Sequence, residues 1–438
     1  MKHRQSQVRT WTGSAATQGK PHGGGEMLNL THLRVAVHVA ACGSVSRTAM
    51  ELFRAQSAIT RSIQELEREL GVSLFERSAS GMALSAAGEV VRQRANRVFD
   101  ELATLARWCA TRQARTRWTQ AHGVPSYLLN TRRLHLLVAL ARHRHMPTAA
   151  AAFGISQPAV SHAIRTLENG ADLRLFERGA RSVRLSAEGE TFLLHVRRAL
   201  NELRHIPDDL AAFEGGVRGQ VTVGALPLGR SLILPEAIAR ISDTYPGIRI
   251  VTDESAYETL VAGLRAGDVD LILGALRPAD PASGLVSERL MSEPMVVLAR
   301  AAHPLSRLGP LRLAQLQDAR WILPRPHAPA RLLFDRLFTR ERLRPPAPAV
   351  ESADLALIRG LLLKTDMIAA LSARQLHHEI EAGELVTLDV PLPDSSRDIG
   401  LTLRAASEPS PAALRLLATV REVVHDLGAG KAHDDSVV

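Results

Sequence analysis

One pattern occurs twice in this chain, and it limits the possible fold more than any other feature. The segment "SAITRSIQELERELGVSLFER" covers Ser57–Arg77, and "PAVSHAIRTLENGADLRLFER" covers Pro158–Arg178. The same shift of 101 residues maps "LSAAGE" at 84–89 onto "LSAEGE" at 185–190 without an insertion. A solenoid needs about three or more repeats, so two copies indicate a compact domain that is present twice.

Each copy predicts helices that are separated by a turn. The spacing of Leu33, Val37 and Ala40 is helical. A short helix of small residues ("RTAMEL") follows the break "CGSV", and a turn then leads to a third helix with Ile59 and Ile63 among its apolar positions. Two short strands around a polar tip come next, and a long helix follows each copy, predicted over 89–117 and 190–213. Helix, turn, helix and a two-stranded wing form a unit that docks on DNA.

The exposed face of the second helix in each such pair carries side chains that suit base edges and phosphates. The predicted DNA-binding residues are Gln56, Ser57, Thr60, Arg61, Gln157, Pro158, Ser161 and His162 on the helices, and Arg77, Arg178 and Arg181 on the wings. The alternative is an ordinary polar surface on a small helical bundle. Repetition of these residues in one register with the apolar pattern favours DNA.

The charge of the chain is unevenly distributed. The net charge is +9. Residues 1–218 contain 30 Lys and Arg against 18 Asp and Glu, a balance of +12, and residues 219–438 contain 24 against 27, a balance of −3. The first half is therefore the candidate for a polyanionic partner such as double-stranded DNA, with a solvated basic surface as the alternative.

Several other protein classes lack support in the sequence. The two cysteines, Cys42 and Cys109, make no disulfide framework, which favours a reducing cytoplasm. No apolar run is long enough to cross a membrane, so no membrane partner is predicted. The histidine pairs lack further metal ligands, and no catalytic motif is present, so we predict no metal, no cofactor and no enzyme. Residues 1–26 are expected to be a disordered tail, with Met27 as a possible true start.

The pattern changes after Gly219. The segments "GQVTVGAL", "IRIVTDES", "VDLILGAL" and "PMVVLAR" read as strands, and helical stretches lie between the first three. Strands that alternate with helices predict a parallel sheet with right-handed crossovers. Ligands bind such folds beyond the carboxyl ends of the strands.

Taken together, the motifs resemble those of the LysR-type transcriptional regulators. That family has "SQPAVS" in the recognition helix, then "LE", "LFER" and "LTxAGE"; the second copy has "ISQPAVSHAIRTLE", "LFER" and "LSAEGE". The resemblance implies two all-α winged helix-turn-helix domains with linker helices, followed by an α/β effector domain of two lobes, similar to type II periplasmic binding proteins. It also implies that the long helix after the wing dimerises, so a homodimer or homotetramer is expected.

The resemblance divides the chain as follows: a tail at 1–26, winged units at 27–88 and 128–189, linker helices at 89–120 and 190–215, an effector domain at 219–424 and a tail at 425–438. Lobe one is expected at 219–293 and 396–424, and lobe two at 294–395. The implied effector site comes from strand ends and comprises Leu228, Arg230, Ser231, Leu276, Arg277, Pro324, Arg325, Ser352 and Ser372. The context is similar to a regulator subgroup typed by a galactose-binding-protein regulator, so a sugar or an aromatic acid is the expected effector.

Each copy departs from the family pattern at a different place, and this leaves alternatives open. The first copy has Ser57 at the usual proline position, and the second replaces "ELG" with "NGAD", where Gly170 is expected to weaken the helix end. Two alternatives stay open: either both copies contact DNA, or only one copy does, and in that case the second copy is favoured. Three arrangements of the first linker helix also stay open: it pairs with the same helix of another chain, it packs on the second linker helix, or it lies near DNA phosphates. A cytoplasmic small-molecule binding protein with helix-turn-helix modules for protein contacts is the alternative function, and RNA polymerase is a further partner that the resemblance allows.

Overall fold

The computed structural model describes residues 27–78, 81–112, 123–178, 183–278 and 280–434. The tail predicted at 1–26 lies outside the described residues. The tail predicted from residue 425 is, as far as residue 434, the end of a long helix, because Val423, Val424 and Leu427 continue an apolar face that packs on the core of the adjacent lobe. None of the described helices is long and apolar enough to cross a membrane.

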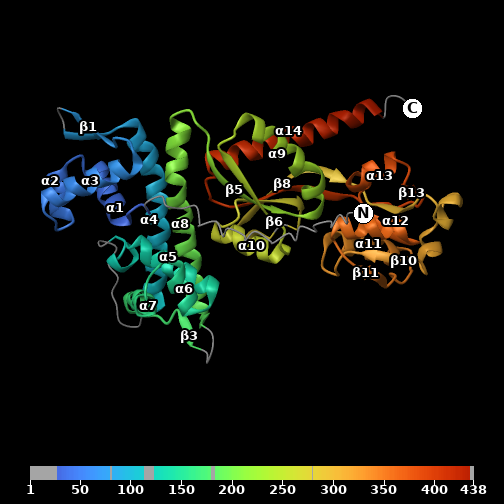
Figure 1. The fold of residues 1–438 in the computed structure, drawn as a ribbon, viewed down its shortest axis with the longest axis horizontal. Coiled ribbons are helices and arrows are strands. Elements are labelled where there is room, and N and C mark those ends of the chain that lie inside the picture. Colours follow the sequence, from blue (N-terminus) through green and yellow to red (C-terminus); the bar gives the residue numbers. More distant parts are fainter. Residues whose placement is uncertain (1–26, 79–80, 113–122, 179–182, 279, 435–438) are drawn as a thin grey trace, which may run out of the picture.

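Two winged helix-turn-helix units form the N-terminal part of the chain (Figure 1). The first consists of α1 (Leu30–Cys42), α2 (Val45–Glu51), α3 (Gln56–Leu70), β1 (Phe75–Ser78), β2 (Gly81–Leu84) and the linker helix α4 (Ala86–Arg112). The second consists of α5 (Thr131–His143), α6 (Met146–Ala152), α7 (Gln157–Ala171), β3 (Phe176–Arg178), β4 (Val183–Leu185) and the linker helix α8 (Ala187–Phe213). Every helix begins and ends at the residue that the 101-residue shift predicts.

The motif residues hold each wing against its helices. The Glu67 carboxylate accepts from the backbone N–H of Leu74 at 2.7 Å, and the equivalent Glu168 accepts from Leu175 at 3.0 Å. A Cβ on Gly88 would lie 2.1 Å from the carbonyl oxygen of Leu74, so only glycine permits this close approach. These parts of the "LE", "LFER" and "AGE" motifs therefore encode the packing of the wing.

Helix α7 keeps the full length of α3 although it contains Gly170, and the expected weakening of the helix end stays a prediction. The helix extends to Ala171, the equivalent of Leu70, where α3 ends. A Cβ on Gly170 would lie 2.3 Å from Cγ of the Tyr127 ring. The glycine thus makes room for an aromatic side chain that packs against the helix end.

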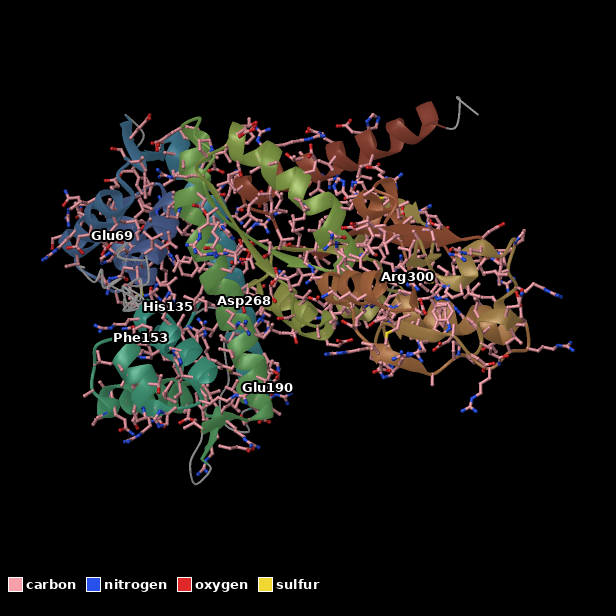
Figure 2. All side chains as sticks on the ribbon, turned by 45° about the vertical axis from the view of Figure 1, so that its right-hand side comes forward. Glu69, His135, Phe153, Glu190, Asp268 and Arg300 are labelled. Carbon is pink, nitrogen blue, oxygen red and sulfur yellow. The ribbon has the colours of Figure 1, made fainter. Side chains whose placement is uncertain are left out.

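The two linker helices pack on each other in antiparallel directions within one chain. Of the three arrangements left open by the sequence, α4 adopts the one in which it packs on the second linker helix. The fully buried Val98 and Ala199 are among the core residues along this pair. Side chains of both units contribute to one hydrophobic core, and Glu69 marks the first unit and Phe153 the second in Figure 2.

The C-terminal part has two lobes, each built on a five-stranded sheet. Lobe one has the order β6-β5-β7-β14-β8, with β5 (Gly219–Ala225), β6 (Ile248–Asp253), β7 (Leu271–Ala275), β8 (Leu285–Glu293) and β14 (Arg397–Arg404). Its helices are α9 (Leu234–Thr244), α10 (Tyr257–Ala266) and α14 (Pro411–Asp434). Lobe two has the order β11-β10-β12-β9-β13, with β9 (Val296–Arg300), β10 (Arg320–Leu323), β11 (Pro348–Glu351), β12 (Met367–Leu371) and β13 (Leu385–Leu388). Its helices are α11 (Pro329–Arg340), α12 (Leu355–Lys364) and α13 (His377–Glu381).

Both sheets are mixed, which corrects the expectation of parallel sheets. Strand β5 pairs in parallel with β6 and β7, but β14 runs antiparallel to β7 and β8. In lobe two, β9 runs antiparallel to β12 and β13. The chain crosses between lobes twice, after β8 and after β13, and the strand that follows each crossover, β9 in lobe two and β14 in lobe one, runs opposite to the other strands of its sheet.

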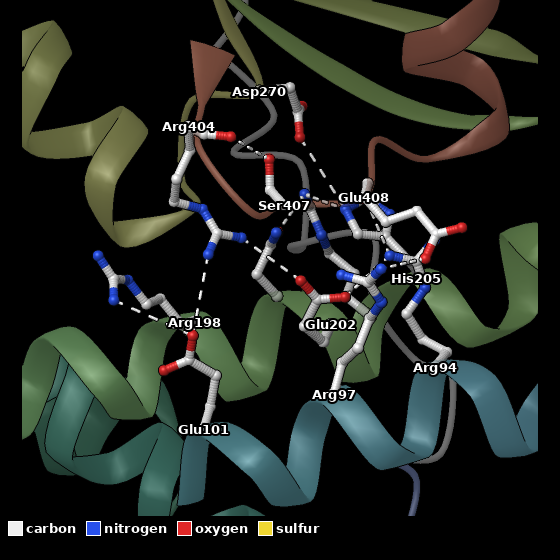
Figure 3. Close-up of polar contacts among 12 residues, drawn as sticks. Arg94, Arg97, Glu101, Arg198, Glu202, His205, Asp270, Arg404, Ser407 and Glu408 are labelled. Atoms are coloured by element: carbon white, nitrogen blue, oxygen red, sulfur yellow. Dashed lines mark hydrogen bonds and ion pairs between the residues drawn. The ribbon is translucent and has the colours of Figure 1, made fainter. Parts of the chain in front are cut away.

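A cluster of buried charges joins the linker helices to lobe one (Figure 3). Arg94 on α4 donates to Glu202 at 2.8 Å and to both carboxylate oxygens of Asp209 on α8, at 2.7 and 3.0 Å. It also donates to the backbone carbonyl of Glu408 at 3.0 Å, just beyond β14. Arg404 on β14 lies 3.4 Å from Glu202. The helix pair and lobe one therefore share one network of charge-assisted hydrogen bonds.

Candidate functional sites

The outward face of α3 is polar and open to solvent. Its inward side buries Ile59, Ile63 and Leu66 against the unit's core, and this leaves five predicted or neighbouring polar positions exposed: Gln56, Ser57, Thr60, Arg61 and Gln64. The Arg61 guanidinium is 80% exposed and donates to Glu65 one turn later at 2.9 Å. This exposed ion pair is weak, so Arg61 is free to exchange Glu65 for a phosphate or a base edge.

Helix α7 presents the equivalent face in the second unit. Ser156 caps its start by accepting from the backbone N–H of Ala159, and Pro158 occupies the first turn, where it has no hydrogen bond to lose. Exposed positions are Gln157, Pro158, His162 and Arg165, and Ser161 is half-buried. The Arg165 guanidinium donates to Ser161 Oγ at 3.0 Å, which orients it across this face.

The predicted wing arginines are described only in part. Arg77 lies in β1 and Arg178 in β3, and Arg181 falls outside the described residues. Arg184 on β4 is exposed. The two hairpins lie beside the ends of their linker helices (Figure 1).

Three of the five arginines on helix α4 pair with acidic residues of the chain, and Arg107 and Arg112 are exposed. Arg94 is buried in the cluster described above, Arg97 pairs with Glu408, and Arg92 pairs with Glu89 one turn earlier. Most of the positive charge in α4 is therefore neutralised within the chain.

A cleft between the two lobes is the candidate effector site. It has a volume of about 120 Å³, and its walls are largely apolar. Four predicted residues line it, each just after a strand: Leu228 after β5, Arg277 after β7, Pro324 after β10 and Ser352 after β11. The parallel strands of both lobes direct their carboxyl ends to this space, which is the usual position of ligands in such folds.

Arg397 at the start of β14 is the cleft residue that the sequence did not indicate. Its Nε and Nη2 atoms are buried and have no hydrogen-bond partner among the described residues. Burial lowers the pKa of Arg397, and the nearby Glu293 carboxylate opposes this shift. Glu293 Oε1 accepts from Ser372 Oγ at 2.5 Å, whereas the buried Oε2 has no hydrogen-bond partner among the described residues and lies 3.6 Å from Arg374 Nε. Buried guanidinium nitrogens without a hydrogen-bond partner are costly, so this position is suited to an anion.

A second arginine reaches the cleft from the neighbouring strand. The Arg277 guanidinium stacks on the Tyr257 ring, with its central carbon 4.3 Å from the ring centroid. Burial lowers the pKa of Arg277. Its one described hydrogen bond goes to the backbone carbonyl of Ala275 at 3.4 Å, so its remaining donors are available to a ligand. Gln375 of lobe two adds an amide to the same cleft.

The other predicted effector residues do not line the cleft. Arg325 is exposed, Arg230 is half-buried behind the lining, and Leu276 lies outside it. Ser231 donates to the carbonyl of Pro227 at 3.0 Å, because its position in the π-helical turn points the hydroxyl back at the backbone. Ser372 is fully buried and bonded to Glu293, so it supports the cleft from behind. Among the described residues, no group of three or more metal-ligating side chains is present.

Comparisons with known proteins agree with this architecture. The family described as "Bacterial regulatory helix-turn-helix protein, lysR family" matches residues 30–89 and again 131–190, and "LysR substrate binding domain" matches residues 214–425. The HTH-type transcriptional regulator GalR of Pseudomonas putida is 49% identical over 399 residues, which cover 91% of this chain and 98% of that protein. The HTH-type transcriptional regulator PcaQ of Agrobacterium fabrum is 30% identical over 302 residues, 68% of this chain and 96% of that protein.

A solved structure shares the fold at lower identity. Full-length OxyR from Pseudomonas aeruginosa, with a cysteine-to-aspartate substitution, superposes with a TM-score of 0.51 at 22% identity, over 68% of this chain and 94% of that one. The two matched helix-turn-helix segments, the matched substrate-binding domain and the relatives named as regulators lead to one conclusion: this chain belongs to the LysR family of transcriptional regulators, DNA-binding proteins with an effector-binding domain.

Proposed function

We propose that the exposed faces of α3 and α7 enter the DNA major groove and that the wings contact the flanking backbone. The observation that carries this proposal is the solvent exposure of the same polar positions in both units, opposite a buried apolar face. Arg61 and His162 occupy equivalent positions and are the central side chains of the two surfaces. A helix face of this kind supplies base contacts, and arginines on a wing supply phosphate contacts.

Binding of the purified chain to DNA from the region upstream of its own gene tests this proposal. We expect Arg61→Ala and His162→Ala each to weaken the footprint, and Arg289→Ala to leave it unchanged. Arg289 is a matched control because it is an exposed arginine in lobe one, paired with Asp398 and remote from both helices. Affinity is expected to fall steeply as salt rises. Unchanged footprints in both variants would refute the assignment of these surfaces.

We further propose that the effector is a small carboxylate with an apolar body, such as an aromatic acid, bound between the lobes. The two arginines in a largely apolar cleft support an acid over a neutral sugar, because a carboxylate would give charge-assisted hydrogen bonds to the Arg397 nitrogens that have no partner among the described residues. The carboxylate is expected at Arg397 and Arg277, and the ring against Leu228 and Ile322. Closure of the lobes on the ligand would then bias the geometry of the linker helices.

Thermal unfolding with benzoate, hydroxylated benzoates and galactose as probes tests the ligand class. We expect at least one of the acids to stabilise the wild-type chain and galactose to have no effect. Arg397→Gln should remove this response, because the guanidinium that binds the carboxylate is lost. Arg325→Gln is the control, since this arginine is exposed outside the cleft. Stabilisation by galactose alone, or an undiminished acid response in Arg397→Gln, would contradict the proposal.

Two finer features complete the proposed function. The identical spacing of every helix in the two units supports an origin by duplication, and the two lobes joined by two crossovers support a domain that closes like a type II periplasmic binding protein. As a regulator of transcription, the chain is proposed to act in the cytoplasm, to self-associate and to meet RNA polymerase at the promoter.

A further inference from the structure

We infer that a single chain forms the complete two-fold DNA-reading unit, so that one chain occupies two half-sites of different sequence. This inference rests on the DNA-reading role proposed above. It follows from the contacts between the two units, which have the pattern of a symmetric dimer inside one polypeptide.

The contacts along the linker helices obey a two-fold relation. In a two-fold interface, a contact between residues i and j recurs as a contact between their equivalents. Arg94 Nη1 donates to Glu202 at 2.8 Å. The 101-residue shift converts this pair into His195 and Glu101, which are also in contact, with Nδ1 and Oε2 2.9 Å apart. The interface is therefore isologous, although both halves belong to one chain.

A second contact places equivalent residues directly against each other. Leu30 and Thr131 are related by the same shift of 101 residues, and the Leu30 N–H donates to Thr131 Oγ1 at 3.3 Å. Thr131 Oγ1 in turn donates to the carbonyl of Leu28 at 2.8 Å, and Thr31 Oγ1 donates to the carbonyl of Leu129 at 3.4 Å. Equivalent positions touch only where a two-fold axis passes, so the first helices of the two units meet at this axis.

The linker helices keep little apolar surface for a second chain. Their apolar residues are buried against each other in one shared core, and of the large apolar side chains on α4 and α8 that the structure describes, Phe213 at the very end of α8 is the exposed one. An interface between copies needs a sizeable apolar centre. The apolar surface of α4 and α8 is therefore occupied by contacts within the chain, and self-association must use other surfaces.

The two reading faces differ at four of five equivalent positions. Gln56 and Gln157 correspond, whereas the other pairs are Ser57 with Pro158, Thr60 with Ser161, Arg61 with His162, and Gln64 with Arg165. Arginine prefers the acceptor pair on guanine and glutamine the donor–acceptor pair on adenine, so exchanging them at one position changes the base that is favoured. A two-fold pair with different faces reads an asymmetric site, which identical subunits do not.

The experiment counts protected half-sites per bound chain. Hydroxyl-radical footprinting of the upstream region defines the protected blocks, and native mass spectrometry of the same duplex gives the number of chains. We expect two blocks per chain, about one helical turn apart. We also expect Arg61→Ala to remove one block of each pair and Arg165→Ala the other, while the matched control Arg289→Ala retains both.

The outcomes separate this inference from the function on which it rests. The single-chain unit would be overturned by one protected block per chain, or by equal weakening of all protected blocks in either variant. In both cases the proposed binding to DNA would still stand. A missing wild-type footprint on the upstream region, with no salt-dependent retention on DNA, would instead remove the proposed DNA-reading role. Folding of each variant is checked by its helical circular dichroism, because all three positions are exposed.

Discussion

Replacement of Arg94 by methionine should loosen the linker helix pair by about 3 kcal/mol. The Arg94 side chain is 4% exposed, and its carboxylate partners Glu202 and Asp209 are 5% and 14% exposed. Removing one partner of a buried ion pair typically costs about 3–5 kcal/mol, because the remaining charges stay buried. We expect the lower end of this range of free energies, because Asp209 retains some contact with water and Glu202 retains its ion pair with Arg404 at 3.4 Å.

Hydrogen exchange measures this loss where it occurs. Exchange of backbone amides in α4 and α8 reports the opening free energy of the helix pair itself. The double variant Arg94→Met with Glu202→Met should recover roughly 1–2 kcal/mol relative to the single variant, since a buried charge without a partner is replaced by an apolar side chain. Arg421→Met is the control, because Arg421 makes an equally short bidentate pair with Glu288 on the surface and should cost less than about 1 kcal/mol.

The reasoning fails under two results. If Arg94→Met and Arg421→Met cost the same, burial does not determine the strength of this pair. If the two cluster substitutions add without coupling of at least about 0.5 kcal/mol, Arg94 and Glu202 do not act as one network.

Three further predictions concern packing, pH and thiol reactivity. Gly170→Ala should destabilise the second unit, because the new Cβ would lie 2.3 Å from Cγ of Tyr127. Gly360→Ala in α12 should instead stabilise the fold by up to about 1 kcal/mol, because no atom lies within 4 Å of the new Cβ. The free energy of unfolding in urea distinguishes the two variants. Burial acts to raise the pKa of Glu101, but the hydrogen bond from His195 and the charges of Arg198 and Arg404 outweigh it and lower the pKa. The stability that Glu101 supplies is therefore complete above the ordinary carboxyl pKa and is lost as pH falls through the lowered value, so Glu101→Gln should flatten the acid limb of a stability–pH curve. Burial raises the pKa of Cys109 to about 11, so iodoacetamide at pH 8 should modify the more accessible Cys42 first, and early labelling of Cys109 by mass spectrometry would contradict the buried position.

The repeated domain could be predicted from the sequence because its signals are local. Caps such as Asn29 and Asn130, the helical spacing of apolar residues and the fixed shift of 101 residues predict each helix of the two units. The strand ends that carry Leu228, Arg277, Pro324 and Ser352 were expected from the family resemblance, and these four residues line the cleft. The family matches confirm the helix-turn-helix units and the substrate-binding domain.

The remaining features depend on contacts between distant segments. Arg397 reaches the cleft because β14 returns from lobe two and runs antiparallel to β7. The family resemblance implies a return to lobe one at residue 396, but the side chain that this strand directs into the cleft depends on its pairing with β7, which has no local signal. The apolar stripe on α4 predicts that a partner exists but does not identify α8 of the same chain. The space that Gly170 leaves for Tyr127 could not be predicted for the same reason, because Tyr127 lies 43 residues earlier.

The direct junction between α8 and β5 has a consequence for how the regulator senses its ligand. One cleft in lobe one and lobe two serves both reading helices, and the Arg94 network ties the shared helix pair to that single sensor. If one chain occupies two half-sites, as proposed, both would respond to one molecule of effector, and occupancy against effector concentration should follow a hyperbola with a Hill coefficient of about one for an isolated chain. Any steeper dose response would have to arise from association between chains.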